Sequence, residues 1–335
     1  MKQAMLYKTG GPDSFKICSA PELVLTDEEI LVNVEYAGVA FADVMMRHGK
    51  YPKMPALPFV PGYDICGIVK EVGNSVAGIR KGDKVIALTQ FGGYSQQTKV
   101  HYKRAVAVPN NVSGADGACL VLNYISAYDM LHKYKHFIPA NKILVHSAAG
   151  GVGTALLQIA RSMGLKVYGT CSTSKMDIVK RNGGIPLDYT KCDFAEVLKQ
   201  LEPDGFDAAF DPVGGAHWLK SRSILKSNGI LVGFGFFSMF DKDNIIGGIM
   251  DSGKIILKLI LVSFIPGSRK FKLYSIQPGN HTAVQKSLTA VKELYLAGKI
   301  KPEIFKIYPL EEVGKAHFDL ANSVSHGKII LDCTK

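Results

Sequence analysis

The residues with the clearest chemical potential form a glycine-rich turn between an apolar strand and an amphipathic helix. Residues 142–153 read KILVHSAAGGVG, and Ala148, Gly150 and Gly153 occupy the three small-residue places of a dinucleotide-binding turn. Small residues allow a tight turn and let the backbone approach a diphosphate, whose charge then faces the N-terminal end of the helix. The predicted diphosphate-binding residues are therefore Gly150, Gly151, Val152 and Gly153.

The end of the next strand indicates which dinucleotide fits this turn. An NAD-binding domain carries an acidic residue about 20 positions further on, where it binds the ribose 2′-hydroxyl. Residues 168–175 read YGTCSTSK and contain no acid, whereas hydroxyls and a cation suit a 2′-phosphate. We therefore predict NADPH as the cofactor, bound here by Thr170, Ser172, Ser174 and Lys175. An ordinary polar helix cap with a solvated Lys175 is the alternative.

These residues require a particular architecture to position them. After about residue 123 the sequence alternates strand and helix patterns, which predicts a doubly wound parallel sheet of the Rossmann type. The first hundred residues instead show short strand patterns separated by Gly, Pro and Asp turns. Residues 305–309 and 328–331 again read as strands and are expected to complete this β unit. The fold class is thus α/β, with a mostly β domain beside a Rossmann domain.

Length and composition limit the structural classes to which the chain can belong. The 335 residues are 47% apolar and 21% charged, which suits a large buried core in two domains and excludes a disordered or collagen-like chain. Lys plus Arg exceed Asp plus Glu by 40 − 29 = 11. A positive net charge of this size attracts nucleic acid, an anionic membrane or a phosphorylated small molecule. The charge alone therefore does not indicate which of these partners the protein binds.

Neither the N-terminus nor the cysteines indicate an exported protein. Residues 1–10 lack the apolar stretch of a secretory signal. The six cysteines lie far apart without a C-x-x-C pair, which favours free thiols over disulfides or a zinc finger. The most apolar stretch, 255–266, is shorter than the ~20 residues of a membrane-spanning helix. We expect a cytoplasmic protein in which this stretch forms a core or lid helix.

Several further segments, in a fixed order, resemble the medium-chain dehydrogenase/reductases. They include residues 38–43 (GVAFAD), 47–51 (RHGKY) and 61–73 (PGYDICGIVKEVG). Within that family the chain is similar to the zinc-free quinone oxidoreductase branch, which includes zeta-crystallin, and residues 120–128 and 211–215 look like its VAT-1 group. The resemblance implies a GroES-like catalytic domain formed by 1–123 and 301–335, and a Rossmann NADPH-binding domain formed by 124–300.

The same resemblance shows that the family's zinc ligands are missing. Zinc alcohol dehydrogenases of the family place metal-binding Cys or His side chains where this chain has Ala40, Tyr63 and Leu122, none of which binds zinc as a thiolate or imidazole does. We therefore predict no metal, and we assign solvated or core roles to the nine histidines. Without a metal Lewis acid the substrate must accept hydride readily, as a quinone or an α,β-unsaturated carbonyl (enone) does.

Hydride transfer to such an acceptor places negative charge on oxygen, which a hydroxyl or amide donor stabilises. The resemblance implies a catalytic role for Tyr51. Asn123, with Tyr124, is the second candidate, and a purely structural role is the alternative for each. The resemblance also implies a homodimer and a set of further cofactor contacts, namely Phe41, Ser126, Tyr189, Val213, Phe234, Gly235 and Lys328.

Two questions stay open at this point. Residues 236–277 combine apolar and basic side chains, which suits a lid, a dimer interface or a surface that makes peripheral contact with an anionic membrane. The chain as a whole could also be an NADPH-binding protein whose main partner is RNA, a membrane or another protein. No aromatic-basic motif supports nucleic acid, which makes it the weakest of these partners.

Overall fold

The computed structural model describes residues 1–19, 22–51, 54–139, 141–235 and 245–335. Their contacts divide the chain into two compact units, one formed by Met1–Ile125 with Gln277–Lys335 and the other by Ser126–Ile276. Residues 236–244, the beginning of the predicted lid or interface segment, lie outside the described residues.

The first unit is built mainly from β-strands. β1 (Lys2–Leu6) pairs antiparallel with β2 (Phe15–Ser19). A larger sheet has the strand order β14-β15-β3-β4-β5-β7, and β6 also pairs with β3. Its strands are β3 (Glu29–Val39), β4 (Asp64–Val72), β5 (Lys84–Leu88), β6 (Gln97–His101), β7 (Ala105–Ala107), β14 (Ile304–Pro309) and β15 (Lys328–Asp332). Because β15 pairs with β3, the end of the chain returns to the sheet that its beginning forms, as the sequence predicts.

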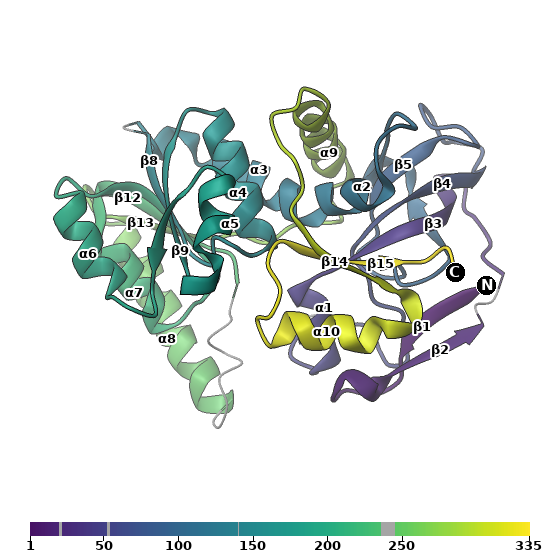
Figure 1. Cartoon of the computed structure of the whole chain (residues 1–335), viewed down its shortest axis with the longest axis horizontal. Coiled ribbons are helices and arrows are strands. Elements are labelled where there is room, and N and C mark those ends of the chain that lie inside the picture. The colour runs from purple at the N-terminus through teal and green to yellow at the C-terminus, as the bar shows by residue number, and fades with distance from the viewer. Residues whose placement is uncertain (20–21, 52–53, 140, 236–244) are drawn as a thin grey trace. The chain divides into compact units, whose positions relative to one another are not determined.

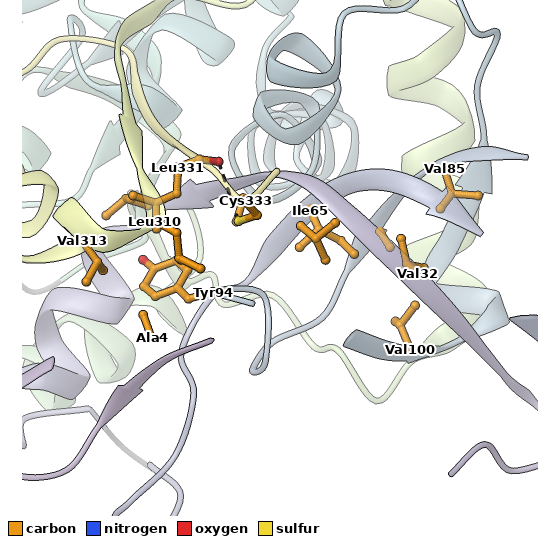
Figure 2. Packing of buried hydrophobic residues seen from close by; sticks show 14 of the residues in the cluster. Ala4, Val32, Ile65, Val85, Tyr94, Val100, Leu310, Val313, Leu331 and Cys333 are labelled. Atoms are coloured by element: carbon orange, nitrogen blue, oxygen red, sulfur yellow. Dashed lines mark hydrogen bonds between the residues drawn. The ribbon is translucent and has the colours of Figure 1, made fainter. Parts of the chain in front are cut away.

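The core of the first unit gathers inward-pointing side chains from strands that are far apart in sequence. Figure 2 shows Val32, Ile65 and Val85 of β3, β4 and β5 together with Leu331 of the C-terminal strand and the ring of Tyr94. All five are buried. Burying an apolar side chain of this size contributes about 1.5–3 kcal/mol, so the C-terminal strand is held by packing as well as by its strand pairing.

Helices at the edges of the first unit complete it and correct one predicted boundary. They are α1 (Phe41–Arg47), α2 (Gly114–Leu120), the start of α3 (Leu122–Lys133), α9 (His281–Leu296) and α10 (Val313–Ala321). The sequence places 277–300 in the Rossmann domain, but α9 packs on α2 and β7 of the first unit. Its Tyr295 hydroxyl donates to the Asp116 carboxylate at 2.7 Å. An amphipathic pattern predicts a helix but does not say which of two sheets the helix covers.

The second unit is a parallel sheet in the order β10-β9-β8-β11-β12-β13, and Figure 1 labels four of these strands, β8, β9, β12 and β13. Its strands are β8 (Lys142–Val145), β9 (Lys166–Cys171), β10 (Ile185–Asp188), β11 (Phe206–Asp211), β12 (Leu225–Gly233) and β13 (Lys270–Leu273). The strand order reverses between β8 and β11, the point at which open parallel sheets bind ligands beyond their carboxyl ends. The predicted Rossmann arrangement is confirmed.

Helices cover both faces of this sheet. They are α4 (Gly151–Ser162), α5 (Met176–Arg181), α6 (Phe194–Leu201), α7 (Ala216–Ser223) and α8 (Ile245–Ser263). α6 and α7 pack Phe194 and Trp218 on the face that carries Leu144. α4 and α5 lie on the opposite side (Figure 1). α4 ends at the predicted place, because Gly164 adopts the left-handed conformation (φ +74°) that terminates a helix.

The apolar stretch 255–266 forms the end of α8 and the turn after it, and most of it is not a core helix. Leu259 is buried, but Leu257, Leu261 and Phe264 are exposed, Phe264 by 79%. Across the described ranges no helix combines the length and the apolar character needed to cross a bilayer. All six cysteines are free thiols, four of them buried.

Candidate functional site

The glycine turn has the close backbone packing that the sequence predicts. Gly150 precedes the first residue of α4 in an extended conformation. A Cβ on Gly153 would lie 2.7 Å from the Cα of Ala148, so no larger residue fits there. The backbone N–H of Ala148 donates to the carbonyl of Thr170 on the neighbouring strand at 3.0 Å. The turn is therefore fixed at the point where the sheet order reverses, with the N-terminal end of α4 beside it, an arrangement that suits a diphosphate.

The segment after β9 holds the predicted 2′-phosphate contacts. Ser172 and Ser174 lie with their hydroxyls 3.4 Å apart. Lys175 is half-buried, and burial lowers the pKa of its ammonium. The side chain of Thr170 instead points toward His146, with Oγ1 2.9 Å from Nδ1. Ser172, Ser174 and Lys175 therefore stay together as a candidate phosphate site, whereas the Thr170 hydroxyl is engaged in the interior.

The structure corrects the expectation that no carboxylate lies near this segment. Asp188 ends β10 and pairs in register with Cys171 at the end of β9. Its carboxylate accepts hydrogen bonds from the hydroxyls of Thr173 and Thr190, which hold its pKa below the usual value. Asp188 comes from the adjacent strand, so a search along residues 168–175 alone could not find it.

The predicted ribose contacts gather at the carboxyl ends of β11 and β12. The backbone N–H of Val213 donates to Oδ1 of Asp211 at 2.8 Å, and that of Phe234 donates to the Asp211 carbonyl at 3.2 Å. A Cβ on Gly235 would lie 2.7 Å from the carbonyl oxygen of Pro212. Tyr189 follows β10 and is 56% exposed. These positions border the same edge of the sheet as the glycine turn.

Tyr51 is the predicted catalytic residue of the first unit, and it has a phenolic neighbour. Its hydroxyl forms a short hydrogen bond with the hydroxyl of Tyr63, and the two rings meet edge to face with centroids 6.4 Å apart. Tyr63 is 1% exposed, and burial raises the pKa of its phenol, so this group stays protonated. Tyr63 occupies one of the places where zinc alcohol dehydrogenases have a metal ligand. A pair of hydroxyl groups therefore lies at a position where zinc alcohol dehydrogenases bind their metal, beside the predicted catalytic residue Tyr51.

The remaining predicted residues on α1 and α3 are divided between the units. Phe41, the first residue of α1, is half-buried, and Asn123 is 7% exposed in the first turn of α3. Both belong to the first unit, whereas Ser126 belongs to the second. Ser126 is buried and contacts Tyr274, whose hydroxyl donates to Asp129 at 3.1 Å. The roles of Phe41, Asn123 and Ser126 toward one cofactor remain predictions.

Asp43 is completely buried and lies at the centre of a polar network in the first unit. Its carboxylate accepts the backbone N–H groups of Ala40 and Gly62 at 2.9 and 3.2 Å and the hydroxyl of Tyr94 at 2.9 Å. Burial raises the pKa of Asp43 to about 7 despite these donors. Since the Tyr94 proton goes to Asp43, Nε2–H of His317 must donate to the Tyr94 oxygen, 3.2 Å away. The network orders the loops on both sides of α1.

Lys328, a predicted cofactor contact, is buried rather than on the surface. Its ammonium lies 2.8 Å from the carboxylate of Asp64, and the two side chains are 3% and 0% exposed. Burial raises the pKa of Asp64, and the ammonium opposes this shift. A Cβ on Gly38 would lie 2.6 Å from an Asp64 oxygen, so glycine is needed beside this ion pair. The charge of Lys328 is thus already balanced within the first unit, and its contact with a cofactor remains a prediction.

A cluster at the reversal point of the second sheet was not found from the sequence. His146 follows β8, Asp211 ends β11, and both are buried. Ser221 of α7 donates to Oδ2 of Asp211 at 2.6 Å, and Nδ1 of His217 lies 2.6 Å from the same oxygen. The Ser221 oxygen also lies 3.0 Å from Nε2 of His146. His146 and His217 are far apart in sequence, but both follow strand ends that parallel pairing brings to one edge, which is the signal that would have indicated the cluster.

Burial and hydrogen bonding determine which groups of this cluster are charged and which atoms carry the hydrogens. Burial lowers the pKa of His146 to about 4, so the ring is neutral near pH 7. Burial opposes ionisation of Asp211, yet the two imidazoles and the Ser221 hydroxyl hold its pKa below the usual value. Because Ser221 gives its one proton to Asp211, it accepts Nε2–H of His146, and the other nitrogen of His146 accepts the Thr170 hydroxyl.

Family models match both units of the chain. Residues 26–134 match the alcohol dehydrogenase GroES-like domain, and residues 184–331 match the zinc-binding dehydrogenase family. The synaptic vesicle membrane protein VAT-1 homolog of Danio rerio is 33% identical over 330 residues, which cover 96% of this chain and 68% of that protein. The chain belongs to the medium-chain dehydrogenase/reductase family. Its predicted GroES-like and Rossmann units are those of this family.

Other members place the chain within the family. The quinone oxidoreductase of Pongo abelii is 29% identical over 340 residues, covering 99% of this chain and 97% of that protein. The crystal structure of Escherichia coli quinone oxidoreductase complexed with NADPH matches 99% of this chain and all of that one, with a TM-score of 0.85 and 26% identity. The human VAT-1 homolog-like protein matches with the same TM-score at 25% identity. This family member is thus an oxidoreductase of the branch that contains quinone oxidoreductases and VAT-1 proteins.

The buried imidazole of His317 predicts a pH dependence of stability. The ring packs against Phe15 with centroids 4.7 Å apart, and burial lowers its pKa from 6.5 to about 3. Between these values the unfolded chain binds the proton and the folded chain does not, so stability falls as pH falls, by up to about 1.4 kcal/mol per pH unit. In urea unfolding from pH 4 to pH 8, His317→Gln should flatten this slope.

Exposed His136 supplies the control for this prediction. His136→Gln should leave the slope of the parent protein unchanged, because this ring reaches solvent in the folded and the unfolded chain alike. A His317→Gln variant with the full parental slope would contradict the assignment of a neutral buried ring.

Proposed function

We propose that the protein is an NADPH-dependent reductase of quinones or α,β-unsaturated carbonyl compounds, and that it works without a metal in its catalytic unit. The observation that carries the proposal is the glycine turn, closely packed at Gly153 and placed where the parallel sheet reverses its order. The positions of the family's zinc ligands hold Ala40, Tyr63 and Leu122, which supports an acceptor that needs no Lewis acid. The family's quinone oxidoreductases support the same reaction class.

The residues at the edge of the second sheet fit NADPH. Gly150 to Gly153 and the N-terminal end of α4 would face the diphosphate, because no side chain caps the start of this helix at Gly150. Ser172, Ser174 and Lys175 would hold the 2′-phosphate. The carboxylate of Asp188 is held by the hydroxyls of Thr173 and Thr190, and Lys175 would supply the positive charge that the phosphate needs. When bound, the cofactor supplies the hydride.

The tyrosine pair would assist the acceptor. Tyr63 is buried and has its proton available, so in the assisting arrangement it donates to the oxygen of Tyr51. The proton of Tyr51, which is half-buried, is then free to point toward a substrate oxygen that gains negative charge. Tyr51 is the catalytic residue of this proposal, and Tyr63 is a positioning residue that acts through it. We also propose that the active form is a homodimer.

Removing the two hydroxyl groups separately tests this mechanism. Tyr51→Phe should lower kcat for quinone or enone reduction by about 100-fold, since it removes the donor to the developing oxyanion. Tyr63→Phe should lower kcat by about tenfold, because Tyr51 loses its orienting partner but keeps its own proton. Both variants should bind NADPH like the parent in fluorescence titrations. Equal kcat in Tyr51→Phe and the parent, for every acceptor that the parent reduces, would falsify the catalytic role.

The candidate phosphate site predicts a preference between cofactors. Lys175→Glu should weaken NADPH binding by about 10- to 100-fold through loss of a charge-assisted contact and added repulsion, and should leave NADH binding within about threefold. Titration of the nicotinamide fluorescence measures both. Lys180→Glu makes the same charge change on exposed α5 and serves as the matched control. Parental affinities in Lys175→Glu would rule out this phosphate site.

The end of α8 favours a second candidate function, contact with an anionic membrane surface. Lys254, Leu257, Lys258 and Leu261 follow helical spacing on one exposed face, and Phe264 continues the apolar surface. Apolar side chains next to lysines are typical of helices that lie in a lipid headgroup layer. This surface is compatible with the reductase activity, so the two functions are not exclusive.

Vesicle cosedimentation tests this second function. The parent protein should bind vesicles that contain 30% anionic lipid, a composition of about physiological charge. A double variant, Leu261→Asp with Phe264→Asp, should lose most of this binding because it places two charges in the apolar surface. Leu219→Asp, on the exposed side of α7, should bind like the parent. Equal binding by the double variant, or none by the parent, would count against a membrane role for α8.

A further inference from the structure

We infer that His146, Asp211 and His217 form a binding site for one divalent transition-metal ion, of the Zn²⁺ type, at the reversal point of the second sheet. Each residue offers one ligand atom, and the three atoms lie within 4.8 Å of one another. Within the ranges that the structure describes, no other group of three His, Cys, Asp or Glu side chains converges in this way. The site is distinct from the family's zinc positions. Ala40, Tyr63 and Leu122 belong to the first unit, whereas the three residues of this cluster belong to the second.

The ligands stand on rigid elements with fixed orientations. His146 is the first residue of the turn after β8, Asp211 ends β11 and His217 lies in the first turn of α7. The Ser221 hydroxyl, on the same helix one turn after His217, lies 2.6 Å from Asp211 Oδ2 and 3.0 Å from His146 Nε2. The three ligand atoms lie within 4.8 Å of one another, and a tetrahedral Zn²⁺ site with ligands at about 2.0 Å places its ligands roughly 3.3 Å apart. Rotation of the side chains must therefore close the longer of these distances around the ion.

The protons of the cluster can leave the ligand atoms without a change in net charge of the side chains. His146 now carries hydrogen on Nε2, and moving it to Nδ1 frees Nε2 while Nδ1–H donates to the Thr170 oxygen 2.9 Å away. This is the second hydrogen bond that a metal-bound imidazole usually makes. His217 now donates Nδ1–H to Asp211, and moving that proton to Nε2 frees Nδ1 as a ligand atom. Asp211 retains the N–H of Val213 on its other oxygen.

Charge and access also suit a cation. Asp211 is 0% exposed, and within the described residues it pairs with the imidazole of His217 rather than with a lysine or arginine. A buried carboxylate gains from a cation that it contacts directly. The side chain of His217 is 26% exposed, which provides a route from solvent. Two imidazoles and one carboxylate favour Zn²⁺, Co²⁺, Ni²⁺ or Cu²⁺ over Mg²⁺ and Ca²⁺.

Trp218 makes the site directly observable. It is the one tryptophan of the sequence, it follows His217, and its indole N–H donates to the Asp211 carbonyl at 3.2 Å. A paramagnetic ion such as Co²⁺ at the site would therefore quench the tryptophan fluorescence of the full-length protein, without NADPH or substrate. This readout is independent of reductase activity, so it fails or succeeds separately from the proposed function.

The experiment titrates chelator-treated, full-length protein with Co²⁺ and Zn²⁺. We expect one Zn²⁺ per chain in competition with a chromophoric chelator, quenching of Trp218 by Co²⁺, and reversal of the quenching by Zn²⁺. His217→Ala should weaken binding by about 100-fold or more and remove the quenching, and His217→Gln should do the same if the alanine variant alters the native fluorescence. His132→Ala changes an exposed histidine on α3, outside the cluster, and should bind like the parent.

Three outcomes would overturn the inference. The first is parent protein that neither binds Zn²⁺ stoichiometrically nor shows quenching by Co²⁺. The second is undiminished binding and quenching in both His217 variants. The third is loss of binding in His132→Ala to the same extent, which would indicate scattered surface histidines instead of this cluster.

Discussion

Parallel pairing of β8 with β9 and β11 is the constraint on which the second unit depends. It brings three carboxyl strand ends to one edge of the sheet, and the chain emerges there as the glycine turn, the Ser172–Lys175 segment and the Asp211–Val213 corner. Because Gly153 has no Cβ, the backbone of the turn can lie directly against the start of α4. The proposed contacts of the glycine turn, of Ser172 to Lys175 and of Val213 follow from that convergence, and so does the cluster of His146, Asp211 and His217.

In the first unit, the buried polar groups are paired with one another, including Tyr63 at one position of the family's zinc ligands. A tyrosine hydroxyl pair forms at Tyr63, and Asp43 is satisfied by two backbone N–H groups and Tyr94. Lys328 balances the charge of Asp64. Groups of this kind are costly to bury unless they are paired. Their pairing keeps the loops around α1 in place and gives Tyr51 a defined neighbour.

Sequence reasoning succeeded where the signal is local. The alternation of strands and helices, the end of α4 at Gly164 and the return of β15 to the first sheet each follow from short patterns of apolar residues and turns. It failed where the outcome depends on which surfaces meet. α9 covers the first unit although it follows the second along the chain, and the end of α8 is exposed although its composition is that of a core helix.

The sequence by itself determined the fold class, the glycine turn and the absence of the zinc-ligand side chains, because these depend on residue type and on spacing over a few residues. Only the tertiary structure decided the surroundings of each group. Asp188 reaches the end of β9 from the adjacent strand, Lys328 meets Asp64, and His217 meets His146 and Asp211. These neighbours are separated by up to hundreds of positions in the chain, and strand pairing and helix packing bring them together, which no local pattern encodes.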